Sequence, residues 1–346
     1  MTGTPAATAS GRGAEPRLVP TPTFGAVKGN ADFDLTPAPS PGRGTVAFDF
    51  PGVEVGTAEY SEGPTGATVI HVPAGARTAI DDRGGAIGIV GRYEYNHAIC
   101  LAGGSVYGLG AAAGVSAELL RREQNQVDWQ HLRTVSGAII YDFSARDNAV
   151  TPDAELGKAA LGWARPGEFP VGRCGAGASA SAGKVDYGRA EFTGQGAAFC
   201  QVGRAKVLVA TVANPVGVVV DRDGTVVRGN YDPEKGTRAH PEADFRNAFA
   251  AEASPRTQRG NTTLTVVITN VALADRELSQ FGKQVHSSMH RAIQPFHSSL
   301  DGDTLFALTT DEVDLADVTG EAELSCVGLG AIASEVAWDA VLSSAA

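Results

Sequence analysis

The stretch GNTTLTVVITN, residues 260–270, passes without interruption from a polar turn sequence into a run of β-branched and aliphatic residues. Such a run is typical of a buried strand, because branched side chains pack well on a pleated surface. Thr262 therefore stands where a loop enters the core. Its hydroxyl could attack the carbonyl of Asn261, and hydrolysis of the resulting ester would free Thr262 as a new N-terminus. A threonine exposed in this way supplies its own base, since an α-amine has an unperturbed pKa of about 7.7–8.0.

The Asn-Thr dipeptide also has simpler interpretations, because such pairs are common. It fits a plain loop that enters a strand, and Asn261-Thr262-Thr263 fits the N-glycosylation pattern. The N-terminal residues lack the apolar core of an export signal. We therefore expect a cytoplasmic protein, in which that glycosylation pattern has no role.

The remaining apolar runs predict a single α/β domain around this strand. Short apolar runs bounded by Gly and Pro indicate strands, whereas apolar residues repeated every three or four positions indicate helices. A segment rich in Gly and Ala predicts a helix that packs closely on its neighbours. The expected strands are 67–72, 206–212, 216–221 and 264–273, and the expected helices are 104–122, 277–293 and 330–342.

Composition excludes several classes of function. The 346 residues include 28 Lys and Arg against 39 Asp and Glu, and the net charge of −11 repels polyphosphate and anionic lipid. No uncharged apolar run reaches the roughly 18 residues of a membrane span. The four cysteines are scattered and form neither a zinc motif nor a disulfide framework. We expect no nucleic-acid partner, no membrane association, and a flexible N-terminal arm over residues 1–35, which are poor in large apolar side chains.

Two polar motifs are candidates for a second kind of site. Asp301 and Asp303 would share a face if they lie on a strand, and one of the two carboxyls would then have a raised pKa. His286 and His290 are four residues apart and could bind one metal ion, and the flanking His297, Asp301 and Asp303 could complete the site. A metal hydrolase is therefore an alternative function, although the Glu of H-E-x-x-H is missing. The simpler interpretation is that both histidines border the apolar stripe of a helix.

A small-residue segment, GRCGAGASASAGK (172–184), ends in Gly-Lys like a phosphate-binding loop. The pattern G-x-x-x-x-G-K-[ST] fails twice, because Ala178 and Val185 stand where Gly and Ser or Thr are required. ATP binding is thus excluded. What remains is Lys184 at the end of a run that could lie close to another backbone, or in a plain surface turn.

Nine blocks spread along the chain give a more specific signal. They are FDFPGV (48–53), EGPTGATVIHVPAGART (62–78), NHAICLAGGS (96–105), IYDFSARD (140–147), SASAGK (179–184), NPVGVVVDRDGTVVRGNYD (214–232), GNTT (260–263), KQVHSSMHRAIQPFH (283–297) and DGDTLFA (301–307). Together they resemble the L-aminopeptidase/D-esterase and β-aminopeptidyl family of N-terminal-nucleophile hydrolases, in its nylon-oligomer hydrolase branch. The resemblance runs from about Leu35 to the C-terminus. The Asp-Gly-Asp positions favour the nylon branch over the aminopeptidases.

The resemblance implies a fold and a processing event. The fold would be a four-layer αββα sandwich, one compact domain with the nucleophile at the start of a central strand. The precursor would cleave itself between Asn261 and Thr262. The large chain, 36–261 after the arm, and the small chain, 262–346, would stay associated in that one domain.

The resemblance also implies roles for individual residues, with no cofactor and no metal. Thr262 would be the nucleophile, with Lys184 beside it to hold its oxygen or tune its proton. Asn214 and Tyr141 would help to stabilise the oxyanion. The substrate would be a small or oligomeric amide, and the processed units would form a homo-oligomer, a tetramer. Asp301 and Asp303 would steer Thr262 or the ammonium end of the substrate.

Overall fold

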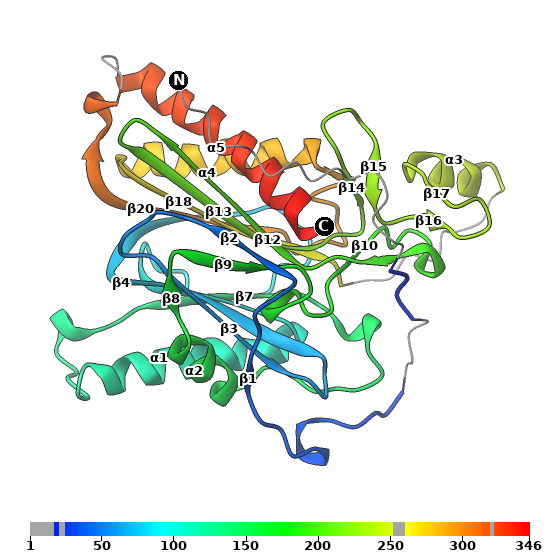
Figure 1. Ribbon diagram of the computed structural model, residues 1–346, viewed down its shortest axis with the longest axis horizontal. Coiled ribbons are helices and arrows are strands. Elements are labelled where there is room, and N and C mark those ends of the chain that lie inside the picture. The colour runs from blue at the N-terminus through cyan, green and yellow to red at the C-terminus, as the bar shows by residue number, and fades with distance from the viewer. Residues whose placement is uncertain (1–16, 21–24, 252–259, 319–321) are drawn as a thin grey trace.

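The computed structural model describes residues 17–20, 25–251, 260–318 and 322–346 (Figure 1). Within these residues an 11-stranded sheet forms the centre of the molecule. At its middle lies β18 (Thr262–Ala272), which pairs antiparallel with β13 (Ala205–Asn214) and parallel with β20 (Thr304–Asp314). The branched run after Asn261 therefore forms a central strand, as the sequence predicts.

The other elements surround this strand. The helices are α1 (Gly110–Arg122), α2 (Ala154–Gly162), α3 (Glu242–Ala250), α4 (Asp275–Ser288) and α5 (Ala322–Ser344). The other strands of the main sheet are β1 (Ala38–Pro39), β3 (Glu54–Tyr60), β4 (Thr65–Asp82), β5 (Ile89–Val90), β6 (Tyr95–Ala102), β7 (Val135–Ile139), β8 (Arg165–Pro166) and β12 (Gln195–Val202). Smaller sheets comprise β2 (Gly44–Ala47) with β9 (Glu168–Val171), β10 (Ser181–Ala182) with β11 (Glu191–Phe192), β14 (Val218–Val220) with β15 (Val226–Arg228) and β19 (Ile293–Gln294), and β16 (Tyr231–Asp232) with β17 (Thr237–Arg238).

The long strand β4 belongs to both halves of the main sheet. Its second half pairs with β20, whereas its first half pairs with β3 and β6. The pairing with β6 is interrupted between His71 and Ala76. The strand order is β12-β13-β18-β20-β4-β6-β7-β5. Side chains of β4 and β6 share one core with side chains of β13, β18 and β20, so the sheet folds at β4 into two layers that face each other.

Alternating side chains produce three cores between four layers. On β13, Val207 and Val209 face α4 and α5, whereas Leu208 and Val212 face the other half of the sheet. A third core joins β3, β4 and β6 to α1 and α2. In Figure 1, α4 and α5 lie above the strands, and α1 and α2 lie below them. The arrangement is the expected αββα sandwich.

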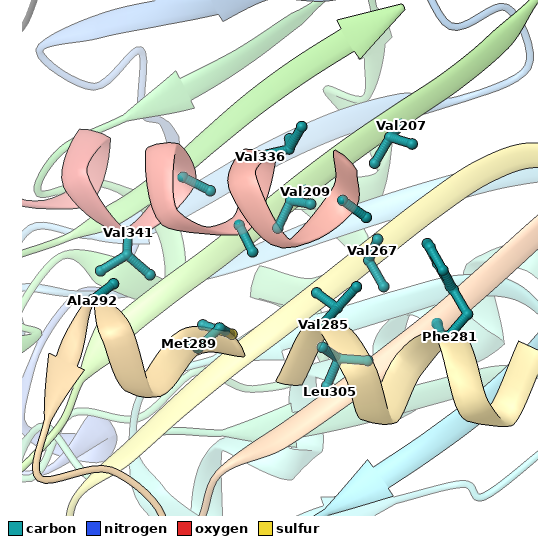
Figure 2. Close-up of a cluster of buried hydrophobic side chains, with 14 of the residues drawn as sticks. Val207, Val209, Val267, Phe281, Val285, Met289, Ala292, Leu305, Val336 and Val341 are labelled. Atoms are coloured by element: carbon teal, nitrogen blue, oxygen red, sulfur yellow. The ribbon is translucent and has the colours of Figure 1, made fainter. Parts of the chain in front are cut away.

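Helix α5 covers the outer face of β13 and β18. From Ser325 to Ser344 it is long and apolar enough to cross a membrane by length and composition, with a mean hydropathy of 1.3. It is a core helix here, because Val336 and Val341 pack with side chains of β13, β18 and α4 (Figure 2). Its exposed face has two charged residues, Glu335 and Asp339, which pair with an arginine.

The helix expected at 277–293 ends earlier than predicted. Helix α4 ends at Ser288, a 3₁₀ turn follows, and Ile293 starts β19 by pairing with Val219. The end of the predicted helix instead joins a small sheet, in which Ile293 and Gln294 pair with β14. The predicted apolar stripe is confirmed, because its four members are buried: Leu278, Phe281, Val285 and Met289.

The expected flexible arm, residues 1–35, is only partly described. Residues 1–16 and 21–24 lie outside the described residues. The remainder contacts the domain: the side chain of Asn30 donates to the carbonyl of Thr151 and accepts from its backbone N–H. This part of the segment is therefore anchored.

The close approach of α1 and α2 gives a test of the packing. A β-carbon on Gly157 would lie 1.9 Å from the carbonyl oxygen of Ala111, whereas one on Gly162, at the end of the same helix, would meet nothing within 4 Å. We predict that Gly157→Ala lowers the free energy of unfolding by about 1–3 kcal/mol through overpacking. Gly162→Ala, the matched control, should be neutral or stabilising. Chemical denaturation measures both, and equal stabilities would contradict the close helix contact.

Candidate active site

The peptide bond between Asn261 and Thr262 is held between two distant segments of the chain. Thr262, the first residue of β18, pairs with Asn214 at the end of β13. Asn261 forms a bridge with Asp301, just before β20. Both residues are buried, with Thr262 only 3% exposed. The bond thus lies inside the sheet, at the end where β13, β18 and β20 meet.

Two hydrogen-bond donors meet at the carbonyl oxygen of Asn261. The Thr262 hydroxyl donates to this oxygen at 2.5 Å, and the backbone N–H of Gly302 donates to it at 2.7 Å. A β-carbon at position 302 would lie 2.8 Å from Thr262 Oγ1, so the nucleophile candidate rests directly against the glycine. A backbone N–H on a carbonyl oxygen is the arrangement that stabilises a developing oxyanion.

Gly260 allows the chain to reach this point past Tyr141. Its φ is 92°, and a β-carbon would lie 2.5 Å from Tyr141 Cγ, so both conformation and space require glycine. The Tyr141 ring packs edge-on against Phe143, with 5.6 Å between centroids. Tyr141 also lines a cavity of about 210 Å³ together with Tyr107 and Arg146. An open volume therefore lies beside the residue that packs against Gly260, next to the expected cleavage site.

The two predicted aspartates are fully buried, and their carboxylates accept hydrogen bonds from backbone around the nucleophile candidate Thr262. Asp301 accepts from the backbone N–H of Val216 at 3.1 Å and from the hydroxyl of Ser298. Asp303 accepts from the backbone N–H of Thr263 at 2.7 Å. Because Thr263 directly follows Thr262, the Asp303 carboxylate holds the backbone of β18 at the second residue of the strand.

Lys184 and Asn214 form the other side of the site. Lys184 Nζ donates to the backbone oxygen of Asn214 at 3.0 Å and to its Oδ1 at 2.8 Å. The Asn214 Nδ2 donates to the carbonyl oxygen of Tyr141 at 3.0 Å. Since Asn214 is the strand partner of Thr262, Lys184 is bound to the residue that pairs with the nucleophile candidate. The backbone N–H that donates to the Asn261 carbonyl oxygen is that of Gly302, and the oxyanion role expected for Asn214 and Tyr141 stays a prediction.

Burial shifts the pKa values of the ionisable groups in the site toward 7. Desolvation lowers the pKa of Lys184 to about 7, against the opposing pull of Asp301 and Asp303. Desolvation also raises the pKa of both carboxyls to about 6, and for Asp301 the charge of Asp303 adds to the shift. Groups that titrate near pH 7 in a buried cluster are suited to proton transfer.

The described residues give no support to a metal site on the two histidines. His286 Nδ1 lies 3.0 Å from Asp81 Oδ2, and His290 Nδ1 lies 3.1 Å from the carbonyl oxygen of Ser287. In the part of the chain that the structure describes, no group of three or more His, Cys, Asp or Glu residues could hold a metal ion. The metal-hydrolase alternative therefore has no geometric basis there.

The structure brings the residues nominated from the sequence into one cluster, buried except for the half-buried Tyr141, while the roles assigned to them stay predictions. Sequence reasoning missed the N–H groups of Gly302 and Thr263, because a backbone donor has no side-chain signature. It also considered His297 only as a metal ligand, whereas its ring contacts Asp303. The nominated residues are Thr262, Asn261, Lys184, Asn214, Tyr141, Asp301 and Asp303.

Known proteins are similar to this chain in sequence and in fold. The model of Peptidase family S58 matches residues 47–345. The chain belongs to peptidase family S58. A 6-aminohexanoate-oligomer endohydrolase of Kocuria sp. (strain KY2) is 60% identical to this S58 peptidase over 334 residues, which cover 95% of this chain and 94% of that protein.

Two solved structures of aminopeptidases confirm the expected fold class. An L-aminopeptidase D-Ala-esterase/amidase of Ochrobactrum anthropi, described as a variant of the N-terminal-nucleophile hydrolase fold, gives a TM-score of 0.61 at 15% identity, over 94% of this chain and 88% of the other. A Burkholderia sp. β-aminopeptidase gives 0.60 at 17% identity, over 89% and 88%. This S58 peptidase is a hydrolase of amide bonds with the N-terminal-nucleophile fold.

The raised pKa of the aspartate pair gives a prediction for stability. A carboxyl whose folded-state pKa is raised stabilises the fold at low pH, and this contribution is lost as the pH rises through the folded value. From pH 4 to pH 7, wild type should therefore lose stability relative to Asp303→Asn. Thermal unfolding of both proteins at the two pH values measures the difference. A difference in melting temperature that does not change with pH would contradict the raised pKa.

Proposed function

We propose that this S58 peptidase cleaves its own chain between Asn261 and Thr262 and then uses Thr262 to hydrolyse amide bonds inside 6-aminohexanoate oligomers. One observation supports the processing step above all: the Thr262 hydroxyl and the Gly302 N–H meet at the carbonyl of Asn261 in a buried site. The substrate class rests on the 60% identity to a relative named for that activity.

Self-cleavage begins with attack of Thr262 Oγ on the carbonyl carbon of Asn261. The carbonyl oxygen gains negative charge, which the Gly302 N–H stabilises. The C–N bond then breaks, the nitrogen of Thr262 takes up a proton, and an ester joins Asn261 to the threonine side chain. Water hydrolyses this ester, which leaves a carboxylate on Asn261 and a free amine and hydroxyl on Thr262.

The proton of the Thr262 hydroxyl needs an acceptor before any free amine exists. Lys184 is suited to this step, because a pKa of about 7 leaves much of its amine neutral near neutral pH. Lys184 also lies in the same buried cluster as Thr262, because its amine donates to Asn214, the strand partner of Thr262. We therefore assign the first proton transfer of self-cleavage to Lys184.

During turnover the new α-amine of Thr262 takes over as the base. Thr262 Oγ attacks the substrate amide, the amine leaves with a proton, and water hydrolyses the acyl-enzyme. Asn214, whose Nδ2 donates to the carbonyl oxygen of Tyr141 in the uncleaved chain, and the Tyr141 hydroxyl help to stabilise the oxyanion in this proposal. The Lys184 cation lowers the pKa of the α-amine and keeps more of it unprotonated.

The processed chains stay together in this proposal, because strands of the small chain pair with strands of the large chain in one sheet. Strand β18 of the small chain pairs with β13 of the large chain, and β20 pairs with β4. We also propose a cytoplasmic homo-oligomer, a tetramer of processed units. Val127 and Trp129 are exposed apolar side chains that such an interface would cover.

The substrate assignment is tested with oligomers that lack a free end. We predict that cyclic and N-blocked 6-aminohexanoate oligomers are hydrolysed, because an internal amide is all that the proposed reaction requires. Product analysis by mass spectrometry measures this. Hydrolysis restricted to free N-terminal residues of short α- or β-peptides would instead indicate an aminopeptidase or β-peptidyl amidase of the same family.

The nucleophile is tested by a pair of neighbouring threonines. Thr262→Ala should remain one uncleaved, inactive chain, since it has no hydroxyl to attack Asn261. Thr263→Val should still cleave, because the Thr263 hydroxyl has no hydrogen-bond partner among the described residues and valine keeps its shape. Denaturing gels and amide hydrolysis assays follow both properties. Cleavage or activity in Thr262→Ala would overturn the proposal.

A further inference from the structure

His297 is joined to the nucleophile strand through Asp303. One carboxylate oxygen of Asp303 accepts from the His297 backbone N–H at 2.9 Å and lies 3.0 Å from His297 Nδ1. The other oxygen accepts from the backbone N–H of Thr263 at 2.7 Å. Asp303 is fully buried, so these contacts determine where its carboxylate points. A continuous path thus connects the His297 ring with the residue after Thr262.

The backbone and ring of His297 are held in a costly arrangement. Its φ is 57°, in the left-handed region that non-glycine residues rarely adopt. The ring stacks on Phe296 with 3.9 Å between centroids, and the ring of His286 lies edge-on at 4.3 Å. Strained backbone of this kind persists where the surroundings over-determine it, often at functional sites.

The hydrogen bonds fix which nitrogen of His297 has the proton. Burial lowers the pKa of His297 to about 4, so the ring is neutral near pH 7. An ionised carboxylate only accepts hydrogen bonds, and the proton of the neutral ring must therefore lie on Nδ1. Among the described residues the buried Nε2 atoms of His297 and His286 have no hydrogen-bond partner. Unpaired buried nitrogens are rare and costly, which indicates that the ring is retained for what Nδ1 does.

We infer that His297 is a positioning residue for the nucleophile: its Nδ1–H orients the Asp303 carboxylate, which in turn fixes the backbone at Thr262 and Thr263. This inference rests on the proposed role of Thr262. Catalysis by a side chain at a strand end requires its backbone to stay in place, and a misplacement of about 1 Å costs on the order of 100-fold in rate. His297 acts through Asp303, and within the described part of the chain no other side chain donates to this oxygen of Asp303.

Two substitutions at position 297 separate the hydrogen bond from the conformation. Asparagine tolerates a positive φ and offers an amide N–H near the place of Nδ1, whereas glycine tolerates that φ and offers no donor. We expect His297→Asn to keep most of the rate of self-cleavage and kcat. His297→Gly should lose about 100-fold in both, with little change in KM for a 6-aminohexanoate oligomer.

His290→Asn is the matched control. The His290 ring also packs against His297, at 4.7 Å between centroids, but its Nδ1 faces the backbone oxygen of Ser287. We expect this variant to match wild type. Equal losses in His297→Asn and His297→Gly would overturn the inference in favour of simple ring packing, and so would full activity in His297→Gly.

Two further measurements keep the test decisive. If His297→Gly does not fold, nitrogen-15 spectroscopy of histidine-labelled wild type, assigned with His297→Asn, reports the tautomer: a neutral Nδ1–H ring supports the inference, and an Nε2–H or charged ring at pH 7 overturns it. Thr262→Ala is assayed alongside. An inactive Thr262→Ala beside a fully active His297→Gly overturns the inference alone, whereas an active Thr262→Ala overturns the proposed function.

Discussion

The site depends on one constraint: the peptide bond between Asn261 and Thr262 is paired on both sides. Asn214 fixes it from β13, and Asp301 and Gly302 fix it from the start of β20. A strand end would otherwise fray, and the Thr262 hydroxyl would sample many positions. With both neighbours in place, the hydroxyl is kept at the carbonyl that it would attack. The long strand β4 supports β20 from the far side, so the architecture of the whole sheet contributes to this placement.

The same burial makes the site electrostatically costly. Lys184, Asp301 and Asp303 are almost completely withdrawn from water, and their pKa values move toward neutrality as a result. Such groups weaken a fold compared with apolar residues of similar size. They are useful where protons must move, because a small change in environment changes their charge. The hydrogen bonds from Val216, Ser298 and Thr263 to the two carboxylates offset part of the cost.

The sequence predicts much of this fold because its signals are local. The branched run after Asn261 predicts β18, and the apolar stripe from Leu278 predicts α4, although the helix ends at Ser288 because Ile293 pairs with β14 in a small sheet. The side chains of the site follow from motifs and family resemblance. The Gly302 N–H and the contact of His297 with Asp303 could not be predicted, because they depend on how separate segments meet. A backbone donor has the same sequence signature at every residue, and a histidine gives no indication of its partner.

The central claim is that this chain processes itself at Thr262, and the intact mass of freshly purified protein under denaturing conditions tests it most directly. Self-cleavage should give two polypeptides, one that ends at Asn261 and one that begins at Thr262, whose masses sum to that of the full chain plus one water. A single full-length chain that remains uncleaved on long incubation near pH 7, where Lys184 is substantially neutral, would contradict the account.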